Sequence, residues 1–371
     1  MKFSVYKNDL LDALKPVAKC AALKPQTPIL SGVKIVAGDG KVTLTATDFN
    51  VAAQAVIPAN VEMDGEVCVS ARYLLEIVNK ISDEVITFDA DENKLNVSSG
   101  GTNFDVPIFN AQEFPTTKFA TEPAFKVRSA LLKEMLTKTI FAVDKGAAGR
   151  PLFEGVNIFT KPTDGGVLLQ ALATNTHRIA AFFGGHVSCD NAPDFNVVVP
   201  VNALYTILAE LGGGEEPVTI VPDGQTLIFH VNNLRLKTRL IEGEFPPVDR
   251  VLYPDTENQM YCNTGELKNA VETAKVVSKH GEYNAVTLKI TNGAINVVAD
   301  SNECGNFSTY VEAQATADLE IAFNADYLSD FLKTVGTRKV CMRFNGKHDP
   351  VQLFGENEDD RYIYVVTPVR V

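Results

Sequence analysis

The chain lacks the sequence signatures of a metal centre, a disulfide framework or a membrane anchor. Its six cysteines stand singly, without a C-x-x-C pair or a Cys/His cluster, so neither a zinc site nor paired disulfides are indicated. No apolar run approaches the roughly 20 residues that a membrane-spanning helix needs. The N-terminus, M-K-F-S-V-Y-K-N-D-L-L, carries charges where a secretory signal has its apolar core. We therefore expect a cytoplasmic protein with reduced thiols, no metal and no membrane contact.

The sequence also lacks the motifs of common enzymes. It contains no G-x-S-x-G, H-E-x-x-H, Walker or G-x-G-x-x-G pattern, and the glycines at 212–214 indicate a turn. One stretch, residues 173–180 (A-T-N-T-H-R-I-A), still suggests chemistry because a histidine can act as a general base. A single histidine in a polar turn is more often a hydrogen-bonded structural residue. We predict no catalytic residue and no cofactor, with a hydrolase centred on His177 as an alternative.

Length and charge bound the number of domains and the kind of partner. The chain has 371 residues, of which 45% are hydrophobic and 22% charged, which is typical of a folded protein too long for one core. Its net charge of −12 argues against nucleic-acid binding, because such binding depends on neutralising phosphates. Net charge is a sum, however, and basic residues gathered on one surface can still attract DNA.

Two sequence patterns each occur three times. An alternating strand followed by an amphipathic helix begins at residues 3–14, 125–136 and 260–271, and a strand end followed by a second helix covers 69–81, 199–211 and 323–335. Short alternating segments separated by turn residues lie between them and favour antiparallel hairpins. The predicted fold class is therefore α+β, with three similar domains of two helices and about eight antiparallel strands each. We place their boundaries at 1–122, 123–254 and 255–371.

Several motifs in this frame resemble one family. They are K-P-Q-T-P-I-L-S-G-V at 24–33, T-A-T-D at 45–48, A-T-N-T-H-R-I-A at 173–180, G-E-F-P at 243–246 and the tail Y-V-V-T-P-V-R-V. Together with the N-terminal M-K-F-S-V, their order and spacing resemble the bacterial DNA polymerase III beta subunit, the sliding clamp family. The resemblance covers essentially the whole chain.

The resemblance implies a DNA clamp fold and a function in DNA replication. Two subunits would close head to tail into a ring homodimer around double-stranded DNA, without sequence preference and without catalysis. Implied partners are the DNA polymerase III alpha subunit, the clamp loader, repair polymerases and other proteins with a clamp-binding motif. A scaffold that has kept the clamp fold but no longer encircles DNA remains an alternative.

Basic residues on and beside the helices could line such a ring, although lysines on amphipathic helices are also ordinary solvated side chains. Contacts to phosphate would carry no sequence information, which suits a protein that slides. The predicted DNA-facing residues are Lys24, Arg72, Lys80, Lys138, Lys145 and Arg150. The resemblance further implies a dimer interface that contains Phe104, Val276 and Val277.

The resemblance also implies a pocket for partner peptides, formed from positions that match the family motif. The predicted pocket residues are Phe153, Thr174, Thr176, His177, Arg178, Ile179, Pro246, Arg250, Val251, Tyr283, Asn324, Tyr327, Val365, Thr367, Pro368, Val369 and Arg370. The sequence departs from the family pattern at four positions. Asn175 and Thr176 replace an aspartate and a glycine, and Thr367 and Val369 replace methionines, so we expect a stiffer and narrower pocket.

Overall fold

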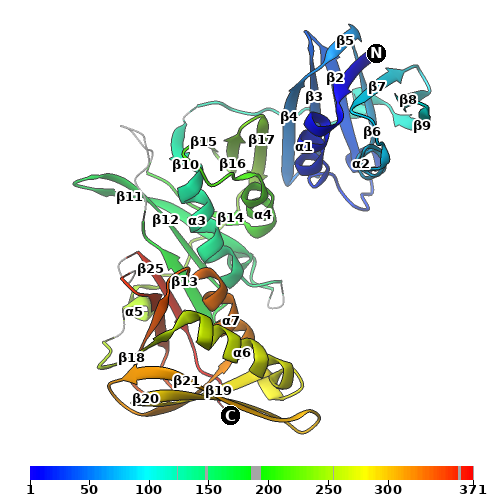
Figure 1. Ribbon diagram of the computed structural model, residues 1–371. Helices are drawn as coiled ribbons and strands as arrows, with labels where there is room; N and C mark the ends of the chain where they lie inside the picture. Colours follow the sequence, from blue (N-terminus) through cyan, green and yellow to red (C-terminus); the bar gives the residue numbers. More distant parts are fainter. Residues whose placement is uncertain (123, 147–148, 185–193, 254, 358–360, 371) are drawn as a thin grey trace. The chain divides into compact units, whose positions relative to one another are not determined.

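The chain forms two compact units, each built around one antiparallel sheet. The computed structural model (Figure 1) describes residues 1–122, 124–146, 149–184, 194–253, 255–357 and 361–370. One unit comprises Met1–Ala130 and Asn202–Leu240, and the other comprises Leu131–Val201 and Ile241–Val371. Cys189, and the prolines at 123 and 254 beside the predicted domain boundaries, lie outside the described residues.

The first unit holds a 13-stranded sheet in the order β10-β15-β16-β17-β4-β3-β2-β6-β9-β8-β7-β1-β5. Its strands are β1 (Lys2–Tyr6), β2 (Gly32–Gly38), β3 (Lys41–Thr47), β4 (Val51–Pro58), β5 (Asn60–Met63), β6 (Gly65–Ser70), β7 (Val85–Ala90), β8 (Lys94–Ser99), β9 (Thr102–Phe109), β10 (Phe125–Arg128), β15 (Pro217–Asp223), β16 (Thr226–Val231) and β17 (Leu234–Arg239). Its helices are α1 (Lys7–Ala18), α2 (Ala71–Lys80) and, from Asn202 onward, α4 (Val201–Glu210).

The second unit holds a 12-stranded sheet in the order β14-β11-β12-β13-β25-β24-β23-β18-β21-β20-β19-β22. Its strands are β11 (Gly155–Thr163), β12 (Gly166–Thr174), β13 (Arg178–Phe182), β14 (Asn196–Pro200), β18 (Asn258–Asn263), β19 (Ala285–Thr291), β20 (Gly293–Ser301), β21 (Gly305–Ala315), β22 (Leu319–Asn324), β23 (Lys339–Phe344), β24 (Val351–Gly355) and β25 (Tyr362–Val366). Its helices are most of α3 (Ser129–Thr139), the single turn α5 (Asp249–Leu252), α6 (Thr264–Ser278) and α7 (Ala325–Thr334).

The strand order confirms the threefold repeat. The first repeat runs β6-β2-β3-β4 and β9-β8-β7-β1, and the third runs β22-β19-β20-β21-β18-β23-β24-β25. The middle repeat contributes β10 and β15–β17 to the first sheet and β11–β14 to the second. The predicted α+β class, with two main helices in each repeat, is therefore confirmed. The exact boundaries at 122 and 254 stay a prediction, because the compact units divide the chain inside the middle repeat.

The two main helices of the third repeat bury one apolar face on their sheet. In the third repeat, α6 and α7 lie side by side (Figure 1), and Leu267, Val271 and Leu328 are almost fully buried. The Phe331 ring of α7 stacks on Tyr362 and Tyr364 of β25, with ring centroids 5.9 and 5.0 Å apart. Burial of such a side chain contributes about 1.5–3 kcal/mol, so this core fixes the helix face of the sheet.

A proline inside a helix removes a backbone donor and can kink or end the helix. Pro16 lies inside α1, and the helix continues to Ala18. Because Pro16 lies near the C-terminal end of the helix, its missing N–H removes few bonds from the backbone ladder. No helix among the described residues is long and apolar enough to cross a membrane.

Candidate functional site

A tight turn joins β12 to β13 at the motif that the sequence singled out. The Thr174 hydroxyl donates to the carbonyl of Arg178 at 2.7 Å and accepts from the N–H of Thr176 at 3.0 Å. The Asn175 side-chain oxygen accepts from the N–H groups of His177 and Arg178, both at 3.1 Å. Threonine and asparagine side chains therefore replace backbone partners and fix the turn, as expected for these residue types.

Backbone conformation shows that one departure from the family pattern, Thr176, is unfavourable. Thr176 has φ of 75°, in the left-handed region that glycine adopts without a steric cost. A β-branched residue is strained there, because its Cβ lies too close to neighbouring backbone atoms. The glycine of the family pattern is therefore the residue that this turn would favour. Thr176 and His177 are both exposed at its tip.

Arg178 does not present its charge to solvent. It is 4% exposed, and one guanidinium nitrogen donates to the carboxylate of Asp330 at 2.8 Å, while another donates to the carbonyl of Phe141. The guanidinium lies 4.5 Å from the Tyr327 ring centroid. Burial acts to lower the pKa of Arg178, but contacts with Tyr364 and Asp330 raise it above the ordinary value. Arg178 thus connects the β12–β13 turn to α7 through its ion pair with Asp330.

The C-terminal tail is attached to the turn. The backbone N–H and the hydroxyl of Thr367 both donate to the carbonyl of His177, at 2.9 and 3.0 Å. Further along, the N–H of Val369 donates to the carbonyl of Ala322 at 2.8 Å. Thr367, at a predicted pocket position, therefore adds a tether that methionine could not make. The expectation of a stiffer and narrower pocket stays a prediction.

An apolar cluster lies on the sheet face opposite α7. Tyr364 faces α7, so its strand neighbours Ile363 and Val365 point to the other face. There they pack with Ile179 of β13 and with Val248 and Leu252 at the single-turn helix α5. Phe245 packs against this cluster and meets Phe153 edge to face, with ring centroids 6.2 Å apart.

The predicted pocket residues fall into two groups around the turn and tail. Phe153, Pro246 and Val251 lie at or beside the apolar cluster, whereas Asn324, Tyr283 and Tyr327 lie around the start of α7. The Asn324 side chain accepts from the N–H of Asp326 and donates to the carbonyl of Tyr283. A bond of 3.2 Å from Asn175 to the Tyr327 hydroxyl connects this group to the turn. We call the whole set of predicted pocket residues the turn–tail surface.

The members of the turn–tail surface differ in exposure: some are accessible to a partner, and others lie buried beneath them. The exposed members are Thr176, His177, Arg250, Val251, Tyr283 and Arg370. The half-buried members are Phe153, Pro246, Asn324, Tyr327, Thr367, Pro368 and Val369. Thr174, Arg178, Ile179 and Val365 are buried, each at 8% exposure or less, so they support the surface from below.

The sequence did not identify the residues that support this surface. Asp330, Phe141 and the apolar cluster members Val248 and Leu252 carry no motif of their own. The only sequence signal was the apolar spacing of residues 245–252, which follows the G-E-F-P stretch.

His177 has no catalytic surroundings. Its imidazole has no hydrogen-bond partner among the described residues, so no carboxylate or hydroxyl orients it as a general base would require. No group of three or more His, Cys, Asp or Glu side chains in the described part of the chain could hold a metal ion. Burial raises the pKa of the thiols of Cys20, Cys68 and Cys262 to about 12, which keeps them protonated and unreactive.

The predicted DNA-facing residues differ in exposure. Lys24, Arg72, Lys80, Lys145 and Arg150 are exposed, and Arg72 forms an ion pair of 3.0 Å with Glu76 on α2. Lys138 does not fit the prediction, because it is only 5% exposed. Its ammonium group lies 3.2 Å from Glu134 and 4.9 Å from the Tyr362 ring centroid. Packing on the aromatic ring thus withdraws this charge from solvent.

The predicted dimer-interface residues lie on two elements. Phe104 is half-buried on β9, and Val277 is half-buried on α6. Val276 is 68% exposed, whereas Leu267, Val271 and Ala274 of the same helix are buried.

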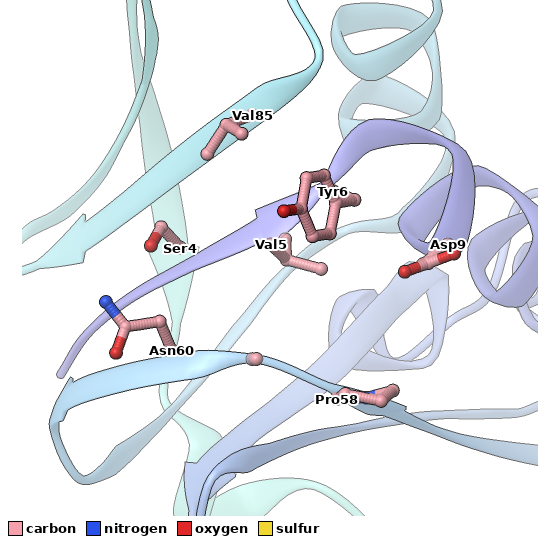
Figure 2. A pocket seen from close by; sticks show the side chains of 8 residues that line it. Ser4, Val5, Tyr6, Asp9, Pro58, Asn60 and Val85 are labelled. Atoms are coloured by element: carbon pink, nitrogen blue, oxygen red, sulfur yellow. The ribbon is translucent and has the colours of Figure 1, made fainter.

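Two similar grooves occupy equivalent positions in the first and third repeats. One has a volume of about 510 Å³ and lies between Tyr6 and Asp9 at the start of α1, Pro58 and Asn60, and Val85 (Figure 2). The other measures about 520 Å³ and is lined at matching positions by Asn263, Glu266, Glu312, Gln314 and Lys339. The lining is largely apolar in one copy and polar in the other, so the shared backbone geometry accounts for both grooves.

Comparison with known families matches the chain in three consecutive parts. Residues 1–118 match the N-terminal domain of the DNA polymerase III beta subunit, residues 126–247 its central domain and residues 249–370 its C-terminal domain.

Whole-chain comparisons agree with these matches. The "Beta sliding clamp" of Bacillus subtilis is 26% identical over 383 residues and that of Halalkalibacterium halodurans 27% over 384, each covering 100% of both chains. The crystal structure of the DNA polymerase sliding clamp from Bacillus subtilis superposes with a TM-score of 0.92 at 26% identity, covering 100% of this chain and 99% of that one. Because the three domain matches follow one another along almost the whole chain and the fold is the same, this chain belongs to the DNA polymerase III beta subunit family.

Proposed function

We propose that this chain is a DNA sliding clamp that closes as a head-to-tail homodimer around duplex DNA and tethers a replicative polymerase. The observation that carries the proposal is the ordered match of all three domains to one family. As a member of that family the chain is a processivity factor and not an enzyme. We expect it in the cytoplasm, with a clamp loader and other clamp-binding proteins as further partners.

Exposed basic residues on the helices support the DNA contact. The side chain of Arg72 is 85% exposed, and Lys80 is exposed at the end of the same helix, α2. Lys24 follows α1, and Lys145 and Arg150 follow α3 in the chain. Long side chains of this kind can neutralise phosphates without reading bases. Lys138 is left out of the proposed DNA contacts because it is buried.

Strand pairing between repeats supports the head-to-tail dimer. The last strand of the middle repeat, β17, pairs with β4, and the last strand of the third repeat, β25, pairs with β13. The equivalent of these last strands in the first repeat is β9. Among the described residues, β9 pairs with β8, and with β6 only at Ile108 and Phe109, so one edge of Thr102–Asp105 is open. In the third repeat, the part of β21 before Ala313 is open on the side away from β20.

The repeat also predicts the register of this dimer contact. Leu236 lies opposite Ala53 and Tyr364 lies opposite Ala180, both pairs on the helix face of their sheets. The matching pair is Phe104 in one subunit and Phe307 in the other. Both rings are half-buried in the single chain, and pairing would cover them beside Val276 and Val277. Sheet edges of this kind otherwise promote uncontrolled association, so a defined partner strand is favoured.

The turn–tail surface is proposed to bind partner peptides. Its apolar cluster would support an apolar side chain, while exposed His177 and Arg370 and the backbone of the tail would orient the peptide. The bond between the Thr367 hydroxyl and His177 supports a narrower peptide preference than the methionine pattern allows.

Primer extension tests the proposed function. A polymerase III core and clamp loader from the source organism are given this chain on a long primed template at moderate salt. We expect products much longer than without the chain, and no gain when the chain is replaced by a Val276→Ala, Val277→Ala variant. Equal product lengths with and without the chain would contradict the proposal.

A further inference from the structure

The β3–β4 turn of the first unit has the same construction as the β12–β13 turn. The Thr47 hydroxyl donates to the carbonyl of Val51 at 2.9 Å and accepts from the N–H of Phe49 at 3.0 Å. The Asp48 carboxylate accepts from the N–H groups of Asn50 and Val51, at 2.9 and 2.8 Å. Phe49 has φ of 74°, where Thr176 has 75°. The two turns thus share the same hydrogen-bond pattern and nearly the same φ at their third residue, with Thr47, Asp48 and Phe49 in the places of Thr174, Asn175 and Thr176.

The strand beside this turn repeats the tail as well. The N–H of Arg239 donates to the carbonyl of Asn50 at 2.8 Å, just as the N–H of Thr367 donates to His177. Lys237 lies opposite Ala52, as Val365 lies opposite Ile179. The E-F-P stretch at 244–246 also has a counterpart, E-F-P at 113–115. A second copy of the turn–tail surface is therefore present in the first unit.

This second copy contains a cavity of about 230 Å³. Its lining includes Phe49, Pro115, Lys118, Thr226, Lys237 and Arg239, and contains no acidic residue. Phe49 is 63% exposed, although it is aromatic. Lys237 and Arg239 thus stand where the other copy has Val365 and Thr367. The chemistry of the site has changed from apolar to basic while the backbone has been kept.

Two of the three cations are available to a ligand. Lys237 lies 3.0 Å from Asp223 and donates to the carbonyl of Lys118, so its charge is partly compensated. Lys118 and Arg239 are exposed, and neither side chain has an acidic partner among the described residues. The chain as a whole carries a net charge of −12, so a site with three cations differs from the average of the chain. The positive charge gathered in this concave site favours an anionic ligand.

The sheet face argues against DNA as that ligand. Along β17, Leu234, Leu236 and Thr238 are buried, and Leu236 lies opposite fully buried Ala53. These residues face the helices, since α1 packs on β3 and β4. Successive side chains of a strand point to opposite faces, so Lys237 and Arg239 lie on the sheet face opposite α1. The proposed DNA contacts, in contrast, lie on and beside the helices.

We propose that this cavity is a second peptide-docking site, selective for an acidic segment that carries an aromatic side chain. Carboxylates of the peptide would pair with Lys118 and Arg239, and the aromatic ring of the peptide would pack on Phe49. Charge-assisted bonds of this kind supply direction as well as affinity. The comparison with a peptide site rests on the proposed function, but the charge and the cavity do not.

Fluorescence anisotropy on the full chain tests the proposal. The probe is a fluorescein-labelled hexapeptide, G-E-D-F-E-G, and its matched control is the amide analogue G-Q-N-F-Q-G. The variant is Lys118→Gln with Arg239→Gln, which leaves the backbone bond of Arg239 in place. The control variant is Arg235→Gln, an exposed arginine on the same face of β17 that does not line the cavity. A consensus clamp-binding peptide and a 20-base-pair duplex are measured on the same preparations.

We expect the acidic peptide to bind more tightly than its amide analogue, and added salt to weaken it. The double substitution should raise its Kd at least about tenfold, corresponding to about 1.4 kcal/mol, while Arg235→Gln changes it less than about twofold. Equal binding of the amide analogue, or an unchanged Kd in the double variant, would overturn the proposal. Duplex that competes with the peptide and loses affinity through the same substitutions would also overturn it.

The parallel probe separates this proposal from the proposed function. The clamp-binding peptide should bind with the same Kd to the chain and to the double variant, because its site lies in the other unit. If that peptide fails to bind while the acidic peptide binds as expected, the turn–tail proposal falls and the second site stands.

Discussion

Single residues in the β12–β13 turn carry conformational strain and a buried charge, and neither could be predicted from composition. The sequence showed that Thr176 stands where the family pattern has glycine. Only the backbone φ of 75° shows the consequence, a β-branched residue in the left-handed region. Likewise, the sequence indicated Arg178 as a contact residue, but its partner Asp330 lies 152 positions away and could not be predicted.

Replacing Thr176 by glycine should stabilise the protein. Glycine adopts the observed backbone conformation without a Cβ clash, so we expect a gain of about 1 kcal/mol in the free energy of unfolding. Urea denaturation followed by circular dichroism measures it. Thr176→Ala serves as the control, since alanine keeps the Cβ and should gain clearly less. A glycine variant no more stable than the alanine variant would contradict the strain argument.

Removing the Arg178 charge should strongly destabilise the second unit. Arg178→Gln leaves the half-buried carboxylate of Asp330 without its cation, at a cost of about 3 kcal/mol. Adding Asp330→Asn removes the unpaired charge, so the double variant should be more stable than Arg178→Gln alone. Urea denaturation of the parent chain, both single variants and the double variant measures these differences in the free energy of unfolding. If the two changes add without coupling, the ion pair does not connect the turn to α7.

At the scale of elements, the sequence predicted the three helix–strand repeats well because their apolar spacing is local. It could not predict that the middle repeat divides its strands between two sheets, since that depends on pairing across long sequence distances. It also did not predict how α6 and α7 are joined. There, the carboxylate of Glu272 lies 2.8 Å from the Lys333 ammonium group and accepts from the Ser329 hydroxyl.

The contact of Glu272 on α6 with Lys333 and Ser329 on α7 should make the stability of the protein depend on pH. Hydrogen bonds from Lys333 and then Ser329 lower the pKa of Glu272 to about 2, against an ordinary value of 4.5. A lowered folded-state pKa contributes stability above pH 4.5, and the contribution disappears as pH falls toward 2. Glu272→Gln should therefore lower the urea midpoint at pH 7, with a smaller difference from the parent at pH 3.5.

The matched control for this pH dependence is Glu282→Gln. Glu282 is exposed and forms no ion pair among the described residues, so its replacement should leave the urea midpoint nearly unchanged at both pH values. A deficit of Glu272→Gln that stayed constant from pH 7 to pH 3.5 would show that the carboxylate charge is not what joins the two helices.

For the whole molecule, encircling DNA requires a closed dimer. Val276 and Val277 on α6 are proposed to cover the pair formed by Phe104 and Phe307 of opposite subunits. Val276→Ala with Val277→Ala removes apolar contact area at that place, so we expect monomers in sedimentation velocity where the parent chain is a dimer.

The control for the dimer prediction is Val56→Ala, which changes an exposed valine on β4 outside the proposed interface. This variant should remain a dimer. A double valine variant that sediments like the parent chain at the same concentration would show that α6 does not contribute to the interface.

The most direct test of a sliding clamp is topological. The labelled chain is loaded with the clamp loader and ATP onto a nicked circular plasmid, and the DNA-bound fraction is separated by gel filtration. We expect the protein to stay with the circle at high salt and to be lost once a restriction enzyme linearises the DNA, because a closed ring slides off free ends. Equal retention on circular and linear DNA, or none on either, would contradict the assignment as a sliding clamp.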